Sequence, residues 1–187
     1  MSLKANWNFP THIRIGSGRL KEIGQCCSDL SIFNPLVVTD KNLGDNEITT
    51  ILKNELNSLK LPHSVFSQVD SNPTEINLIQ GLEILKEGGF DGVIAFGGGS
   101  ALDLGKLLAF MIAQDLPVWE FEDLSDNWKR ANTQGILPII AIPTTAGTGS
   151  EVGRAGVLTD SINKIKKVIF HPEMLPKSVI CDPNLSF

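Results

Sequence analysis

Two segments of the 187-residue chain place glycine and hydroxyl-bearing residues directly after apolar runs. In the first, Gly97, Gly98, Gly99 and Ser100 separate the apolar run 92–96 from a segment with helical periodicity. Glycine lets the backbone turn sharply and approach a ligand closely. The first turn of a helix also presents unpaired N–H groups at the positive end of its dipole. With the Ser100 hydroxyl as a further donor, this segment predicts a phosphate or pyrophosphate site.

The second segment follows the apolar run 135–143 and carries Thr144, Thr145 and Thr148, interspersed with glycine. It therefore offers several hydroxyl and N–H donors at the end of one predicted strand. In an open α/β sheet, ligands bind outside the carboxyl ends of the strands, so two such loops can hold opposite sides of a nucleotide. A plain turn that binds nothing explains either segment more easily than it explains both.

Asp40 ends a third apolar run, 36–40. A carboxylate at the end of a strand can accept hydrogen bonds from both ribose hydroxyls of an adenosine, and it repels a 2′-phosphate. Asp40 therefore favours NAD over NADP. A helix N-cap or a turn aspartate is the alternative role for this residue.

The first segment fits neither of the common phosphate-binding patterns. A GxGxxG motif would need glycine where Leu102 stands. A P-loop needs four residues between its glycines and a serine or threonine after its lysine, whereas Leu107 follows Lys106 here. A glycine-rich turn between strand and helix, without a ligand, is the structural alternative.

Hydrophobic patterning predicts the elements that position these loops. Short runs rich in β-branched residues predict strands over 36–40, 64–69, 92–96, 135–143 and 178–182. A 3.6-residue periodicity predicts helices over 43–59, 75–87 and 101–113. This alternation predicts an α/β fold, with a Rossmann-like, doubly wound and mostly parallel sheet.

The remaining segments complete one predicted domain over 1–187. The stretches 153–160 and 164–170 predict a β-hairpin near the C-terminal end, and the segment 9–24 predicts an edge strand. At the start of the helix 75–87, Asn72 suits an N-cap, Pro73 the first turn and Glu75 the acid of a capping box.

Composition narrows the function classes. The net charge is −5 and no long basic run exists, which disfavours nucleic-acid or anionic-membrane partners. No apolar run approaches the ~20 residues of a membrane helix, and the opening residues lack the apolar core of a signal peptide, so we expect a cytoplasmic protein. The three cysteines suit free thiols, and the isolated histidines His12, His63 and His171 do not suggest a metal site.

The two loop segments together resemble a known family. GGGSALDLGK and PTTAGTGSEV are similar to the paired signatures of the iron-dependent (group III) alcohol dehydrogenases. FPTHIRIGSGRLKEIG, VTDKNL, DSNPT, LTDSINKIKKVI and CDPNL continue the resemblance over essentially the whole chain. It implies a Rossmann-like domain that binds NAD(P), with NAD favoured.

The resemblance also implies roles for single residues. In the family, residues matching Gly97, Gly98, Gly99 and Ser100 hold the pyrophosphate. Those matching the three threonines of the second segment line the nicotinamide and phosphate side. Asp40 matches the acid that selects NAD.

Three further positions follow from the same resemblance. Asn72 lies where the family often has a residue near the adenosine. Lys166 matches a lysine that reaches the cofactor, and Lys164 is a less well aligned candidate. Asp103 belongs to the first signature and either contacts the cofactor or caps the N-terminus of its own helix.

The resemblance assigns neither a catalytic residue nor a metal ligand to this chain. The family carries an all-helical domain whose aspartate and three histidines bind Fe²⁺ or Zn²⁺, and we expect that domain to follow the last matching segment and to be absent here. The full enzyme would transfer hydride between a primary or secondary alcohol, or the matching aldehyde, and NAD. We expect the chain alone to bind NAD weakly, if at all, and not to oxidise alcohols.

The resemblance also implies a homodimer.

Other interpretations of the same residues stay open. A glycerol dehydrogenase or a dehydroquinate synthase-like relative would share the fold and the glycine turn. A non-catalytic nucleotide-binding module would use the same loops. A plain structural domain would fill both loops with side chains.

Overall fold

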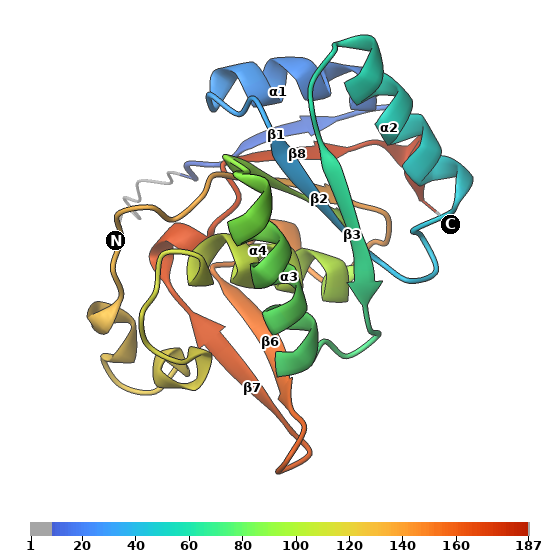
Figure 1. Ribbon diagram of the computed structural model, residues 1–187. Coiled ribbons are helices and arrows are strands. Elements are labelled where there is room, and N and C mark those ends of the chain that lie inside the picture. The colour runs from blue at the N-terminus through green and yellow to red at the C-terminus, as the bar shows by residue number, and fades with distance from the viewer. Residues whose placement is uncertain (1–8, 187) are drawn as a thin grey trace, which may run out of the picture.

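The computed structural model describes residues 9–186, with a six-stranded sheet at its centre (Figure 1). The expectation about a signal peptide rests on residues 1–10, and 1–8 of these lie outside the described residues, as does residue 187. In the order of the sheet, its strands are β1 (His12–Ile15), β8 (Ser178–Cys181), β5 (Ile139–Pro143), β4 (Gly92–Gly97), β2 (Pro35–Asp40) and β3 (Ser64–Val69). All neighbouring strands in this sheet run parallel, so the expected sheet is fully rather than mostly parallel.

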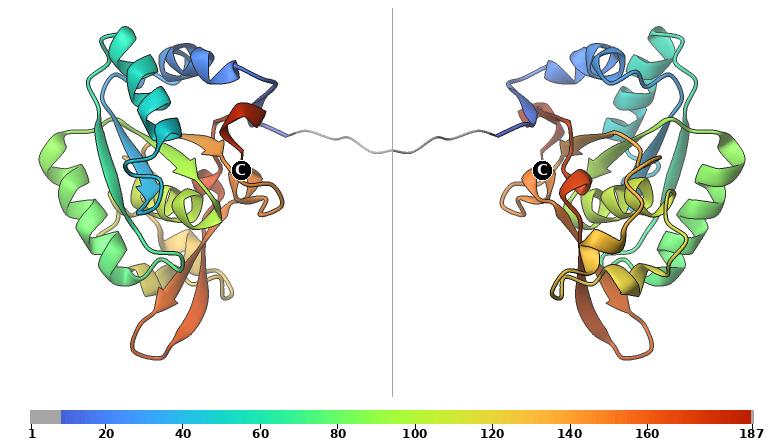
Figure 2. Two further views of the ribbon diagram at one scale, coloured as in Figure 1. Left: turned by 90° about the vertical axis from the view of Figure 1, so that its right-hand side faces the viewer. Right: turned by 90° about the vertical axis from the view of Figure 1, so that its left-hand side faces the viewer.

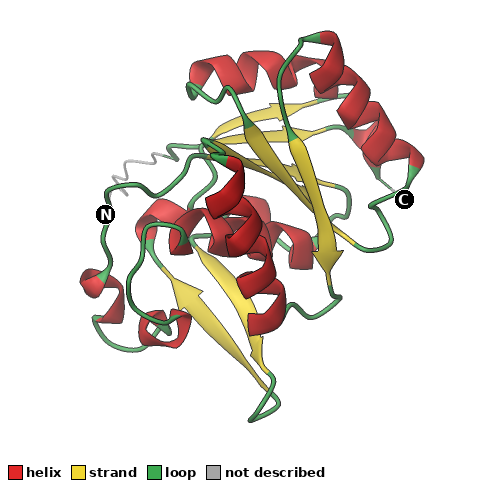
Figure 3. Cartoon of the chain, viewed as in Figure 1, coloured by secondary structure: helices red, strands yellow, loops and turns green. Residues whose placement is uncertain are grey.

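Helices cover both faces of the sheet (Figure 3). The α-helices are α1 (Ile23–Asp29), α2 (Glu47–Ser58), α3 (Glu75–Gly88) and α4 (Gly99–Met111). Short 3₁₀ helices are η1 (Arg19–Glu22), η2 (Val118–Phe121), η3 (Asn127–Arg130), η4 (Ser150–Val152), η5 (Pro172–Met174) and η6 (Pro183–Leu185).

Strand β4 shows why the layers form. Its Val93 and Ala95 lie in one buried cluster with α3 and α4, whereas Ile94 and Phe96 lie in a second cluster with α1 and α2. Successive residues of a strand point to opposite faces, so an apolar strand must be covered on both sides. The predicted doubly wound α/β fold is confirmed.

The strand order reverses between β2 and β4. The chain passes from β2 to β3 at one edge, and then returns to place β4, β5 and β8 on the other side of β2. Where the order reverses, the loops that leave the two strands diverge and open a crevice at the carboxyl ends. Asp40 and the segment Gly97 to Ser100 leave the sheet at this point.

The predicted hairpin forms a separate two-stranded ribbon of β6 (Ala155–Asp160) and β7 (Ile165–Phe170). Figure 2 shows this ribbon projecting from the body of the molecule. Leu158 and Ile169 anchor it in the buried cluster beside α4. The Thr159 N–H donates to the Pro73 carbonyl at 2.8 Å, which joins the ribbon to the start of α3.

Several predicted boundaries are wrong. Helix α2 begins at Glu47 rather than at 43, because the Asn46 side chain accepts from the Ile48 N–H at 3.1 Å and starts the helix there. Helix α3 is capped by Thr74, with Asn77 completing the capping box, so the predicted N-cap Asn72 lies outside the helix. Strand β5 begins at 139, four residues later than expected.

A further boundary error concerns the loops themselves. Helix α4 already includes residues 99 and 100, whereas 101 was the predicted start. The glycine segment and the helix therefore overlap.

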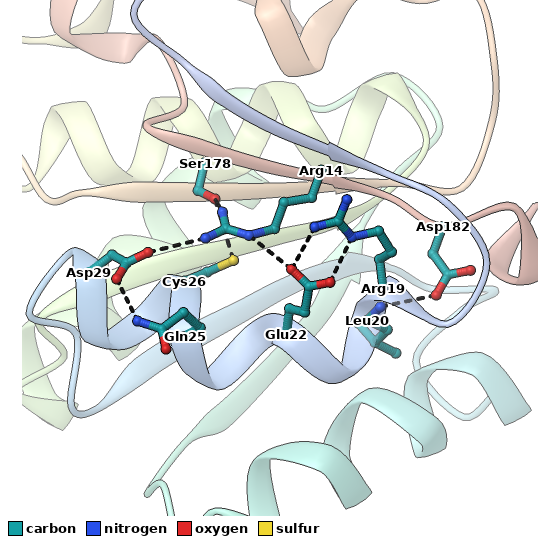
Figure 4. Close-up of polar contacts among 9 residues, drawn as sticks. All are labelled: Arg14, Arg19, Leu20, Glu22, Gln25, Cys26, Asp29, Ser178 and Asp182. Carbon is teal, nitrogen blue, oxygen red and sulfur yellow. Dashed lines mark hydrogen bonds and ion pairs between the residues drawn. The ribbon is translucent and has the colours of Figure 1, made fainter.

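A polar network fastens β1 to α1 at one edge of the sheet (Figure 4). We call Arg14, Arg19, Glu22, Asp29 and Ser178 the Arg14 network. The Arg14 guanidinium lies 3.2 Å from Glu22 Oε2 and 3.1 Å from Asp29 Oδ2, and it donates to Ser178 Oγ at 2.8 Å. Arg19 pairs with the second oxygen of Glu22 at 2.6 Å. Both guanidinium groups thus have carboxylate partners within this network, and the Ser178 hydroxyl donates to Cys26 Sγ at 3.4 Å.

The three cysteines, Cys26, Cys27 and Cys181, are free, as predicted. Burial raises the pKa of the Cys27 thiol to about 12, which keeps it protonated and unreactive. Among residues 9–186, no helix is long and apolar enough to cross a membrane.

Candidate functional site

Three cavities lie at the carboxyl ends of the central strands. The first, of about 320 Å³, is lined by residues that follow β2, β3 and β4, with Asp40, Lys41 and Asp70 among them. The second, of about 340 Å³, shares Ser71 and the glycine segment with the first and continues toward the ribbon. The third, of about 290 Å³, lies beside the second loop segment. The two predicted loops therefore border adjoining hollows.

The glycine segment turns the chain from β4 into α4. Gly97 has a φ of 139°, a conformation that residues with a side chain rarely adopt. Gly98 is the N-cap, and its carbonyl accepts the first intrahelical bond, from Leu102 at 3.0 Å. The N–H groups of the first turn consequently have no partner within the helix and lie at the positive end of its dipole. This is the geometry expected of an anion site.

The second loop lies directly against the glycines. A Cβ atom on Gly99 would lie 3.1 Å from Thr148 Cγ2, and one on Gly98 would lie 3.4 Å from Thr145 Oγ1. The Thr144 N–H donates to the Gly97 carbonyl at 3.0 Å and ties the two loops together. Thr145 and Thr148 are exposed, and Thr144 is buried. The structure thus brings the two predicted segments together.

The Ser100 hydroxyl has a different partner from the one expected. It donates to the Ser71 carbonyl at 2.6 Å, in the loop after β3. Its donor is therefore occupied within the protein, and the backbone N–H groups of α4 remain the donors available to a phosphate. The contact also fixes the position of Ser71, which lines both the first and the second cavity.

Asp40 has the role of a turn aspartate and also lines the first cavity, so its contact with a ribose stays a prediction. Its Oδ1 accepts from the N–H groups of Asn42 at 3.0 Å and Leu43 at 3.1 Å, as in a turn aspartate. The side chain also lines the first cavity, and its Oδ2 would lie 3.3 Å from a Cβ atom on Gly97. One carboxylate oxygen therefore holds the turn, while the residue faces the glycine segment.

Asp103 does not cap α4, because it is the fifth residue of the helix. Its Oδ1 accepts from the Ser150 hydroxyl at 2.5 Å, and its Oδ2 accepts from the Val157 N–H at 3.1 Å. The capping alternative is wrong, and Asp103 instead joins α4 to η4 and β6. The residue also lines the second cavity, so its predicted cofactor contact stays a prediction.

The sequence around Lys106 shows only that this lysine does not belong to a P-loop, because its role depends on tertiary contacts. Its ammonium lies 3.2 Å from Asp103 Oδ1 and donates to the carbonyls of Ser150, at 3.0 Å, and Ala155. The side chain is 1% exposed, and this burial lowers its pKa while Asp103 opposes the shift. The buried Asp103–Lys106 pair holds the chain that follows the second loop.

The two remaining predicted residues lie at the second cavity. Asn72 and Lys166 both line it and both are exposed. Lys166 stands opposite Thr159 in the ribbon. Lys164, the less well aligned candidate, lies in the turn of the ribbon and does not line this cavity.

The described residues do not fit a metal centre. Within 9–186, no group of three or more histidine, cysteine, aspartate and glutamate side chains is placed to hold an ion. His171 is buried against Phe110, with ring centroids 5.1 Å apart, and burial lowers its pKa. These residues therefore assign no metal-dependent step to the chain.

A sequence model of one family, iron-containing alcohol dehydrogenase, matches residues 10–183. The chain is 33% identical over 179 residues to the 4-hydroxybutyrate dehydrogenase of Cupriavidus necator, covering 95% of this chain and 46% of that protein. It is 27% identical over 180 residues to the NAD-dependent methanol dehydrogenase of Bacillus methanolicus, covering 96% and 46%. The chain thus spans about half the length of the curated relatives it matches.

Solved structures agree with this match. The sulfoacetaldehyde reductase from Bifidobacterium kashiwanohense, crystallised with NAD⁺, superimposes with a TM-score of 0.85 and 32% identity over 98% of this chain and 47% of that one. A 1,3-propanediol oxidoreductase gives a TM-score of 0.87 and 29% identity over 97% and 46%. Sequence model, relatives and structures all indicate the same group. The chain belongs to the iron-containing alcohol dehydrogenase family.

Proposed function

We propose that this chain binds NAD across the carboxyl ends of β2, β4 and β5, as the nucleotide-binding half of an alcohol dehydrogenase. The observation that carries the proposal is the cradle formed by Gly98 and Gly99. Neither residue has a side chain, both face the threonine loop, and both stand at the first turn of α4. A pyrophosphate placed there meets backbone N–H groups and the helix dipole.

The residues around this cradle suit the other parts of a dinucleotide. Asp40 lines the hollow on one side and would accept from the adenosine ribose, which favours NAD over NADP. Thr145 and Thr148 offer exposed hydroxyls on the other side, toward the nicotinamide. Asn72 and Lys166 border the second cavity, where Lys166 would neutralise phosphate charge.

NAD, when bound, supplies the hydride acceptor for the oxidation of a small alcohol to an aldehyde or ketone. The contribution of this chain is to hold the dinucleotide, to offset the charge of its phosphates and to fix its orientation. We propose that residues 1–187 form the NAD-binding domain, and that the metal and most of the alcohol pocket come from a helical domain outside them. The isolated chain should therefore not oxidise alcohols.

Assembly and location stay predictions. A homodimer would use the edge strand β1, whose Ile13 and Ile15 are exposed. We further propose that the enzyme is cytoplasmic.

Calorimetric titration of the chain with NAD and then NADP tests the proposal. Because the chain alone should bind NAD weakly, we expect a small heat from NAD at high ligand concentration and little or none from NADP. Gly98→Val tests the cradle directly. The backbone of Gly98, with a φ of −77° and a ψ of −177°, accommodates a β-branched residue, whereas the valine side chain would fill the cradle. The variant should unfold within about 4 °C of the wild type, since valine is a poorer N-cap than glycine, and it should lose NAD binding. NAD binding that survives in Gly98→Val, or no NAD binding by the wild type, would overturn the proposal.

A further inference from the structure

An ion pair lines the first cavity, next to Asp40, the residue proposed to select NAD. Lys41 Nζ is 2.6 Å from Asp70 Oδ1, and both side chains line this cavity together with Asp40. The pairing follows from the register of the sheet. Asp40 on β2 is the partner of Val69 on β3, so the next residue of each strand stands at the same level. The pair therefore borders the place where an adenosine ribose would meet Asp40.

Asp70 is held in place from its other side. Its Oδ2 accepts from Asn77 Nδ2 at 3.0 Å, and Asn77 is a buried residue of the α3 capping box. Asn77 also donates to the Gln68 carbonyl at 2.8 Å, which fixes its orientation. Hydrogen bonds from Lys41 and Asn77 lower the pKa of Asp70, so it is an anion at neutral pH. The carboxylate is fixed, while the lysine reaches it through a flexible stem.

This arrangement bears on the choice between NAD and NADP, which differ by one 2′-phosphate. A free lysine ammonium beside the ribose is a natural partner for that phosphate. Here Lys41 already has a partner. If it moved to a phosphate, it would leave the Asp70 carboxylate uncompensated beside a second anion, and Asp40 would add a third.

We propose that Asp70 is a specificity-determining residue, which disfavours NADP by keeping Lys41 from the 2′-phosphate. The inference rests on the proposed function, because it places the adenosine ribose at Asp40. It adds that the preference for NAD depends on the Lys41–Asp70 pair as well as on Asp40.

The test compares Asp70→Asn with the double variant Asp70→Asn/Lys41→Met. Asparagine keeps an acceptor for Asn77 and removes the charge that holds Lys41. We expect Asp70→Asn to bind NADP on the order of tenfold more tightly than the wild type, because one new lysine–phosphate contact forms. Its affinity for NAD should change by no more than about twofold, since NAD has no group for the freed lysine. The double variant should lose most of the gain.

Titration calorimetry with NAD and NADP gives both affinities, and thermal unfolding checks that each variant is folded. The single and the double variant are also made in the Asp40→Asn background, where the loss of the Asp40 charge should bring NADP binding into the measurable range. NAD binding with no gain for NADP in Asp70→Asn would overturn this proposal alone. So would an equal gain in the double variant, because the gain would not come from Lys41. No NAD binding by the wild type would overturn the proposed function, and this proposal with it.

Discussion

The Arg14 network and the carboxyl edge of the sheet are both rich in polar groups, but they use them differently. In the Arg14 network, the guanidinium of Arg14 meets two carboxylates and one hydroxyl, all within 3.2 Å (Figure 4). At the carboxyl edge, the donors are backbone N–H groups and the exposed hydroxyls of Thr145 and Thr148, which border hollows. Polar content therefore does not mark a ligand site by itself, and the proposed nucleotide site rests on donors that the fold leaves without a protein partner.

The buried pair of Asp103 and Lys106, next to the carboxyl edge, resembles the Arg14 network in that its polar atoms bind partners within the protein. Its hydrogen bonds hold Ser150 and Ala155 in place. The loops that carry the unpaired donors are thus held in place by a buried pair whose own polar atoms all have protein partners. This contrast leads to two predictions about stability and one about ligand binding.

The largest effect is expected for Lys106→Met. The change keeps the apolar stem but leaves Asp103 without its cation and two carbonyls without a donor. Removal of one partner from a buried pair costs about 3–5 kcal/mol of unfolding free energy, and we expect the lower end of this range because Asp103 is 15% exposed. Urea denaturation measures the loss. The double variant Asp103→Asn/Lys106→Met should recover part of the lost unfolding free energy. A loss below about 1 kcal/mol in Lys106→Met would contradict a stabilising role for the buried pair.

A smaller effect is expected for Arg14→Met. The Arg14 side chain is 15% exposed, and its pairs lie near the surface, so the loss should be about 1–2 kcal/mol. Lys129→Met is the matched control, because its pair with Asp126 is largely exposed and should contribute no more than about 0.5 kcal/mol. Urea denaturation separates the two variants. NAD affinity should stay unchanged in both, and a loss of NAD binding in Arg14→Met would break the proposed division between the two regions.

How far the sequence predicts the molecule depends on whether a feature is local. The strand-to-helix turn at Gly97 to Ser100 could be predicted because turn chemistry resides in the residues themselves. The run 64–69 matches β3 residue for residue. By contrast, α1 was not predicted, because its seven residues are too short for a periodic signal. Its stability comes from the burial of Ile23, Cys26 and Cys27 against the sheet.

The candidate site divides in the same way. Asp40 and the threonine loop follow strands and could be named from their position. The hydrogen bonds of Ser100 to Ser71, and of Asp103 and Lys106 to Ser150, could not be predicted, since each joins residues at least 29 positions apart in the chain. The pairing of Lys41 with Asp70 also needed the register of β2 and β3, which no single run of sequence contains. The predicted helix starts were wrong for a related reason, because the N-cap residues Asn46 and Thr74 determine where α2 and α3 begin.

The most direct test of the central claim is an NMR titration of the ¹⁵N-labelled chain with NAD. The account predicts that amide shifts concentrate at residues 97–101 and 144–148, with smaller changes near Asp40. The amides around Arg14 and Glu22 should not move, because the two guanidinium groups there are already paired with carboxylates of the chain. Shifts centred on the Arg14 network, or spread evenly over both regions, would contradict the claim that the open carboxyl edge is the nucleotide site.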